Sequence, residues 1–291
     1  MTDAAGPSAA APEDTEMEFH QPKPVHSWRD FVKELGTIAL GVCIALAAEQ
    51  GVEWYHWRSK VTLAREQIAS EMTSNFEGAI SRIRIGPCVE RRLDALALIL
   101  DAASKSGALP PVGDIGVPRP IIWSTGVWDS LVASETATHF PTGHLQNLAV
   151  TYKAIQRLDE GGRQELEEWK ILYGMVGPGR RLDPASEAQL RQALGQARGS
   201  NRMLTNMSSQ LFRTTKNLEI QFSPDERADL TLWKQMPLTG GKPTLYAPVR
   251  FSICNPMGPV PASYGQAPYS AFPSLMNEAL KTIPDFSGAA K

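Results

Sequence analysis

The stretch that decides the fold runs from Leu35 to Ala48 and reads LGTIALGVCIALAA, fourteen consecutive residues without a charge. As an α-helix these residues would span about 21 Å, which is less than the hydrocarbon core of a bilayer, about 30 Å. Phe31 and Val32 extend the apolar run on its N-terminal side. We therefore predict one transmembrane helix over residues 28–57. The alternative is a buried helix of a soluble domain, because core helices and membrane spans overlap at this length.

Aromatic residues bracket this segment as they do at the two interfaces of a bilayer. Trp28 precedes the apolar run, and three further aromatic residues follow it: Trp54, Tyr55 and Trp57. Trp28 and Trp54 are 26 positions apart. That separation is about 39 Å along a helix, close to the full thickness of a bilayer, about 40–45 Å. These four residues are the predicted membrane-interface anchors, and the lipid bilayer is the first predicted partner.

Small residues recur along the predicted span at the spacing that lets helices pack closely in a membrane. They are Ala39, Cys43, Ala47 and Gly51 at every fourth position, with Gly41 and Ala45 as a second pair. The pattern is compatible with a homo-oligomer formed through the span, although alanine-rich spans also produce it by chance. Glu49 and Glu53 lie four residues apart at the end of the span, and we interpret them as an interfacial pair rather than a proton site.

The sequence on the two sides of the predicted span differs in composition but does not decide the orientation of the span. Residues 1–26 are predicted to form a disordered acidic arm, since the first twenty residues contain five acids and no Lys or Arg. This arm lacks the basic and then apolar order of a signal peptide. The basic residues nearest the span leave its orientation undecided, because three precede it and three follow it: Lys23, Arg29, Lys33, Arg58, Lys60 and Arg65. The whole chain carries a formal charge of −2, which argues against a nucleic-acid partner.

Beyond the span, apolar residues spaced at threes, fours and sevens predict a helical extramembrane domain over residues 58–220. We expect the first helix to continue from the span to the breaker Gly86-Pro87, and a second helix to begin at Cys88. Further helices are expected over residues 121–139, 145–160, 163–175 and 184–218, the middle two separated by the pair Gly161-Gly162.

Residues 221–291 contain many prolines and no sustained period. We predict a mostly irregular tail packed on the bundle, with short strands at 245–253 and a short helix at 273–282. The predicted fold class is therefore all-α, with one N-terminal transmembrane helix continuous with a helical bundle and an irregular proline-rich C-terminal segment.

Two of the three cysteines lie outside the predicted span, and they are the candidate disulfide, Cys88 with Cys254. A bond between them would close a loop of about 166 residues and contribute about 4–5 kcal/mol in the chain-entropy model. It would also require an oxidising compartment such as the periplasm. The alternative is two unrelated buried thiols, because spacing alone does not show that the residues meet.

No catalytic, cofactor or metal motif is recognisable, and no cofactor is predicted. His139 and His144 flank a turn, where a surface or capping role is simpler than metal binding. Five carboxylates fall on polar helix faces and are interpreted as solvated: Asp94, Asp101, Glu165, Glu167 and Glu168. The lack of motifs argues against an enzyme without excluding one, because active sites are also built from residues scattered along a chain.

Two blocks of sequence resemble a family of uncharacterised bacterial inner-membrane proteins. The first has Phe31, Glu34, the run Gly41-Val-Cys-Ile-Ala-Leu46 and Trp54, followed by a helix with Glu71 and Asn75. The second runs from Trp128-Asp-Ser-Leu through Leu145 to Tyr152. Cys88 and Cys254 are similar to paired cysteine positions of proteobacterial relatives. The resemblance implies a single-pass protein of the bacterial inner membrane with a helical domain outside, and it implies no activity.

The leading hypothesis is a single-pass membrane protein with a cytoplasmic N-terminus, whose periplasmic helical domain binds a protein partner or scaffolds a complex. An anchor joined to a domain without a catalytic signature motivates it. The runner-up is a membrane-anchored sensory or ligand-binding module, because a helix continuous with a span can couple the two sides of a membrane. A hydrolase would need a polar cleft that the sequence does not reveal.

Overall fold

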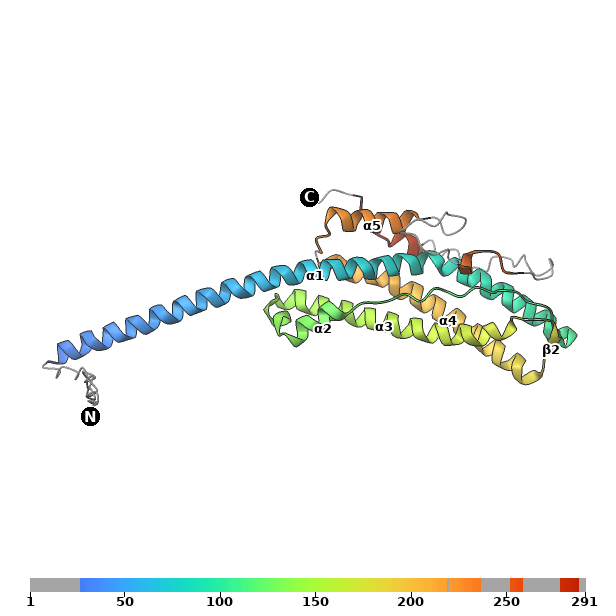
Figure 1. Ribbon diagram of the computed structural model, residues 1–291, viewed down its shortest axis with the longest axis horizontal. Coiled ribbons are helices and arrows are strands. Elements are labelled where there is room, and N and C mark those ends of the chain that lie inside the picture. The colour runs from blue at the N-terminus through green and yellow to red at the C-terminus, as the bar shows by residue number, and fades with distance from the viewer. Residues whose placement is uncertain (1–26, 219, 237–251, 259–277, 288–291) are drawn as a thin grey trace, which may run out of the picture. The chain divides into compact units, whose positions relative to one another are not determined.

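The computed structural model describes residues 27–218, 220–236, 252–258 and 278–287 (Figure 1). The predicted N-terminal arm, residues 1–26, lies outside the described residues. The chain divides into two units between Tyr55 and His56. The prediction of an all-α fold, with a long apolar N-terminal helix that continues into the helical region, is confirmed.

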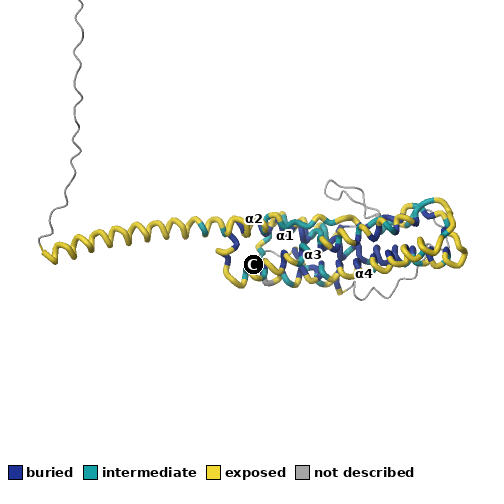
Figure 2. Tube along the Cα trace, turned by 90° about the horizontal axis from the view of Figure 1, so that it is seen from below, coloured by how far each residue is buried: buried dark blue, intermediate teal, exposed yellow. Residues whose placement is uncertain are grey.

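Helix α1, Trp28–Ser106, is 79 residues long and carries the apolar stretch in its first part. Every residue of this helix as far as His56 is exposed, as the yellow part of the tube in Figure 2 shows. Among the described residues, α1 is the one helix long and apolar enough to cross a membrane. The alternative of a buried core helix does not fit, since none of its most apolar 18-residue window is buried.

The second unit is built on the rest of α1 together with two long helices, α3 (Thr142–Leu172) and α4 (Pro184–Thr215). Shorter elements complete it: α2 (Gly126–Ala133), η1 (Thr136–His139), η2 (Tyr173–Met175), η3 (Lys216–Leu218), α5 (Pro224–Gln235) and η4 (Ser252–Cys254). A two-residue antiparallel pair, which the sequence did not predict, joins β1 (Ala108–Leu109) to β2 (Arg180–Arg181).

Local signals explain where two of the helices begin. Asp183 caps α4, its carboxylate accepting from the backbone N–H groups of Ala185 and Ser186 at 3.0 and 2.9 Å, and proline follows at the first helical position as predicted. Ser223 and Glu226 form a reciprocal capping box at the start of α5. The prediction of a mostly irregular tail is therefore wrong for residues 224–235.

Two predicted helix breaks do not occur. Helix α1 continues through Pro87, although proline removes a backbone hydrogen bond at a cost of about 3 kcal/mol. The neighbours on both sides, Ile83, Ile85 and Val89, are fully buried, and this burial offsets the cost. Helix α3 likewise continues through Gly161 and Gly162 to Leu172.

Gly161 has a packing role that explains its place inside a helix. A Cβ atom at Gly161 would lie 2.7 Å from Met203 Cε and 3.0 Å from Leu204 Cδ2 of α4. The missing side chain therefore allows α3 and α4 to approach closely.

Other boundaries also differ from prediction. The helix expected over residues 121–139 is confined to α2 and η1, because Glu135 adopts a left-handed conformation (φ 58°) between them. Of the predicted short helix at 273–282, residues 278–281 are helical and 273–277 lie outside the described residues. Of the predicted strands at 245–253, residues 252–253 belong to η4 and the others lie outside the described part.

The core of the second unit consists of two hydrophobic clusters along the bundle. One surrounds Phe76, Ile80 and Tyr152, and the other surrounds Leu96 and Trp169. Along α1 the first cluster ends at Ile83 and the second begins at Ile85. Buried polar side chains are found in this part of the bundle, and they form the candidate site.

Candidate functional site

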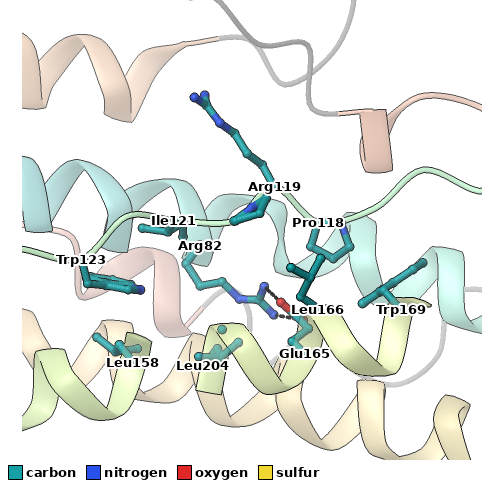
Figure 3. A pocket seen from close by; sticks show the side chains of 12 residues that line it. Arg82, Pro118, Arg119, Ile121, Trp123, Leu158, Glu165, Leu166, Trp169 and Leu204 are labelled. Carbon is teal, nitrogen blue, oxygen red and sulfur yellow. Dashed lines mark hydrogen bonds and ion pairs between the residues drawn. The ribbon is translucent and has the colours of Figure 1, made fainter. Parts of the chain in front are cut away.

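A buried ion pair joins α1 to α3 at the boundary of the two clusters (Figure 3). Arg82 Nη1 and Nη2 donate to Glu165 Oε2 and Oε1 at 2.6 and 2.8 Å, a bidentate arrangement. Arg82 is 2% exposed and Glu165 is 5% exposed. Arg82 Nη2 also donates to Asn201 Oδ1 of α4 at 2.8 Å. One guanidinium thus fixes the register of three helices.

The polar network continues from Asn201 toward the surface. Asn201 Nδ2 donates to the carbonyl of Gly86 and to Glu90 Oε2, both at 3.2 Å. Glu90 Oε1 in turn pairs with Arg202 at 3.1 Å and with Arg198 at 3.3 Å. Because buried charges are costly unless they are paired, this chain of contacts compensates the burial of Glu90.

Glu168 lies one turn beyond Glu165 and is also buried. Its Oε1 accepts from Ser200 at 2.9 Å and from Gln164 at 3.2 Å. Burial raises the pKa of Glu168 above its ordinary value, and these hydrogen bonds oppose the rise. The interpretation of Glu165 and Glu168 as solvated carboxylates is wrong, because both side chains are buried and accept hydrogen bonds from other helices, Glu165 from Arg82 and Glu168 from Ser200.

A small cavity of about 20 Å³ lies beside the ion pair, lined by Arg82, Trp169 and residues 118–121. Arg82 Nε and Trp169 Nε1 have no hydrogen-bond partner among the described residues. The volume suits about one water molecule rather than a substrate. Figure 3 shows Arg119, which also lines the cavity, pointing away from the ion pair. The Arg82 network therefore has the character of a structural element.

A second buried polar group, centred on Glu71 of α1, holds the start of α2. Glu71 Oε1 accepts from the Ser124 hydroxyl at 2.7 Å and from the Val127 N–H at 2.9 Å. Its Oε2 accepts from the Tyr152 hydroxyl at 2.7 Å. Burial, together with this hydrogen bond, raises the pKa of Tyr152. Asn75 pairs with the backbone N–H and C=O of Ser124, both at 2.9 Å.

The Glu71 group unites residues from both blocks that carry the family resemblance. Glu71 and Asn75 belong to the first block, and Trp128 and Tyr152 belong to the second. The rings of Trp128 and Tyr152 stack at 5.1 Å between centroids. Local sequence patterns did not predict these contacts, because they join positions up to 81 residues apart.

A half-buried carboxylate lies in an open pocket of about 400 Å³ between α1 and α5. Burial and the negative charge of Asp229 raise the pKa of Glu77 to about 7, while a hydrogen bond with Trp233 opposes the rise. Such a group titrates near neutral pH.

The candidate disulfide residues are brought to bonding distance. The sulfur atoms of Cys88 and Cys254 lie 2.07 Å apart, and their Cα atoms 4.8 Å apart. Arg92, one turn further along α1, donates to the backbone carbonyls of Ile253 (3.4 Å), Asn255 and Ile115. Residues 252–258 are thus held on α1 by the Cys88–Cys254 pair and by the buried guanidinium of Arg92.

The predicted anchors lie in two environments. Trp28, Trp54 and Tyr55 are 77%, 62% and 70% exposed. Trp57 is half-buried and stacks on His139 at 3.7 Å between ring centroids. The six small residues of the span are all exposed: Ala39, Gly41, Cys43, Ala45, Ala47 and Gly51.

His144 stacks on Phe140 at 5.6 Å between ring centroids. The part of the chain that the structure describes contains no group of three or more His, Cys, Asp or Glu side chains able to hold a metal ion. Comparison of the chain with protein-family models, with curated proteins and with solved structures found no match.

Proposed function

We propose that this protein is a single-pass protein of the bacterial inner membrane whose helical domain binds a protein partner or scaffolds a membrane complex. The observation that carries the proposal is the exposure of the apolar part of α1. Ile38, Leu40 and Ile44 are each more than 60% exposed. A continuous apolar surface of this kind is stable in lipid and is a liability in water.

The proposed orientation has a cytoplasmic N-terminus and residues 58–291 in the periplasm. The proximity of Cys88 and Cys254 supports it, because disulfides persist in oxidising compartments. The basic residues that flank the span favour neither orientation.

The interaction role rests on how the buried polar groups are used. In the described residues, Arg82, Glu165 and Glu71 bond to other parts of the bundle rather than facing a substrate-sized cavity. The alternative of a sensory or ligand-binding module draws support from the continuity of α1, which runs from the apolar segment into the polar network.

Reporter fusions after Lys291 test the orientation. A phosphatase that is active only in the periplasm should be active in this position, and a fluorescent protein that matures only in the cytosol should stay dark. The reverse pair of results would overturn the orientation. Extraction of membranes with alkaline carbonate tests the anchor separately, since a protein with an integral span stays in the pellet.

Crosslinking in the native membrane tests the interaction role. A stoichiometric protein partner that crosslinks to residues of the helical domain is the expected outcome. Recovery of the protein alone, with a copurified small molecule, would favour the ligand-binding alternative.

A further inference from the structure

A second open cavity, of about 490 Å³, lies at the end of α4. Four phenylalanine side chains form its apolar wall: Phe76, Phe212, Phe222 and Phe286. They come from α1, from α4, from the segment just before α5 and from the segment that follows residue 281, and the ring centroid of Phe76 lies 4.9, 5.6 and 6.3 Å from the other three. Its volume is in the range of small-molecule sites, about 300–1,000 Å³. We call it the phenylalanine pocket.

Two basic side chains line the same pocket. Arg213 and Lys216 are exposed, and the structure places no ion-pair or hydrogen-bond partner on either among the described residues. Two exposed cations beside an apolar wall favour a ligand with one negative end and one apolar end. The C-terminus of α4 disfavours an anion through its partial negative charge of about 0.5, but two full positive charges outweigh it.

The remaining polar groups of the wall are already bonded within the protein. The Thr215 hydroxyl donates to the Leu211 carbonyl at 2.7 Å, and the Thr282 hydroxyl donates to the Ala279 carbonyl at 2.6 Å. A peptide in this pocket would leave backbone N–H and C=O groups without partners, which is costly. A hydrocarbon chain has no such groups along its length.

We propose that the phenylalanine pocket binds a long-chain fatty acid, with the acyl chain against the phenylalanine rings and the carboxylate at Arg213 and Lys216. The proposal is independent of the partner-binding function. It adds a ligand site to the helical domain, whatever the identity of the protein partner.

Photolabelling of the full chain in phosphatidylcholine nanodiscs tests this site. The probe is palmitate with a diazirine near the end of its chain, and labelled peptides are mapped by mass spectrometry. We expect label on peptides that contain Phe222 or Phe286, and competition by unmodified palmitate but not by hexadecylamine. Equal competition by the amine, or no label on these peptides, would overturn the proposal. Label on residues 28–57 reports the anchor separately, because that label depends on contact with the bilayer.

A charge-reversal pair supplies the matched control. Arg213→Glu with Lys216→Glu should lower labelling of the pocket about tenfold, since the two attractive charges are lost and two repulsive ones replace them. Arg157→Glu with Arg181→Glu changes the charge equally at exposed positions elsewhere and should leave labelling unchanged. Equal labelling in both double variants would contradict the role of the two cations.

A filling variant tests the apolar half of the pocket. Ile220→Trp adds bulk to the wall while keeping both cations, and it should reduce labelling to background. A melting temperature equal to that of the wild type, measured for Ile220→Trp and for Arg213→Glu with Lys216→Glu, shows that the fold is intact. Full labelling of a folded Ile220→Trp protein would place the acyl chain elsewhere and overturn the site.

Discussion

The two parts of α1 belong to one helix but have different surroundings, because the first part exposes apolar side chains and the second part buries charged side chains beside apolar ones. Residues 28–55 expose isoleucine, leucine and valine side chains, whereas Arg82, Glu90 and Arg92 further along are 2%, 3% and 5% exposed. Local sequence makes both parts helical, but it does not determine what surrounds them. Charged side chains of α1 are therefore buried only where other segments of the bundle supply partners for them.

The largest expected effect comes from Arg82 in the buried part. Arg82→Met should destabilise the domain by about 3–5 kcal/mol, because it leaves the Glu165 carboxylate buried without its partner. Urea unfolding followed by tryptophan fluorescence measures the change.

The double variant Arg82→Met with Glu165→Leu is the control for this prediction. It removes the stranded charge as well, and should recover more than half of the lost stability. A double variant as unstable as the single one would show that packing around Arg82 matters more than its charge.

The pair Cys88 and Cys254 tests whether the buried part of α1 depends on a covalent tie. Cys88→Ser with Cys254→Ser should lower the free energy of unfolding by about 2–5 kcal/mol, since the bond closes a long loop in the unfolded chain. A reductant should lower the melting temperature of the wild type only. Equal sensitivity of both proteins to the reductant would mean that no such bond forms.

An aspartate in each part of α1 tests the contrast in solvent directly. Ile38→Asp should make the free energy of membrane insertion less favourable by about 2.5–3.5 kcal/mol if residues 28–57 lie in lipid. Leu63→Asp is the matched control, because Leu63 is 55% exposed on the same helix beyond the span. The fraction of each variant that stays in alkali-washed membranes measures its insertion. Equal fractions for the two variants would contradict the assignment of lipid to the first part of α1 only.

The smallest expected effect is the pH dependence of Glu77. Its pKa in the folded protein is about 7, above the ordinary value of 4.5. The folded state therefore binds more protons than the unfolded state between these values, and this group destabilises the fold progressively as the pH rises through that window.

Glu77→Gln removes that dependence. Since Glu77 is only half-buried, the variant should gain about 1 kcal/mol over the wild type at pH 8 and little at pH 4. Melting temperatures at the two pH values measure this. A gain that is equal at both would assign the effect to packing and not to the charge of Glu77.

The sequence was sufficient for the helical class and for the candidate pair Cys88 and Cys254. It was not sufficient for Glu165 and Glu168, because a carboxylate on a helix has the same local pattern whether it faces water or a partner on another helix, Arg82 for Glu165 and Ser200 for Glu168. Pro87 was misread because its local cost is offset by burial of its neighbours. Helix α5 was missed although its signal, Ser223 followed by Glu226, is local and could have been found.

The close approach at Gly161 gives α3 and α4 a fixed separation. Glu165, one turn further along α3, bonds to Arg82 at the separation of α3 and α4 that Gly161 allows. A larger residue at position 161 would push α3 and α4 apart. It would thereby lengthen the hydrogen bonds between Glu165 and Arg82, although it contacts neither residue. Gly161 is thus a spacer for the ion pair, and substitutions at positions 161 and 82 should not be additive in their effect on stability.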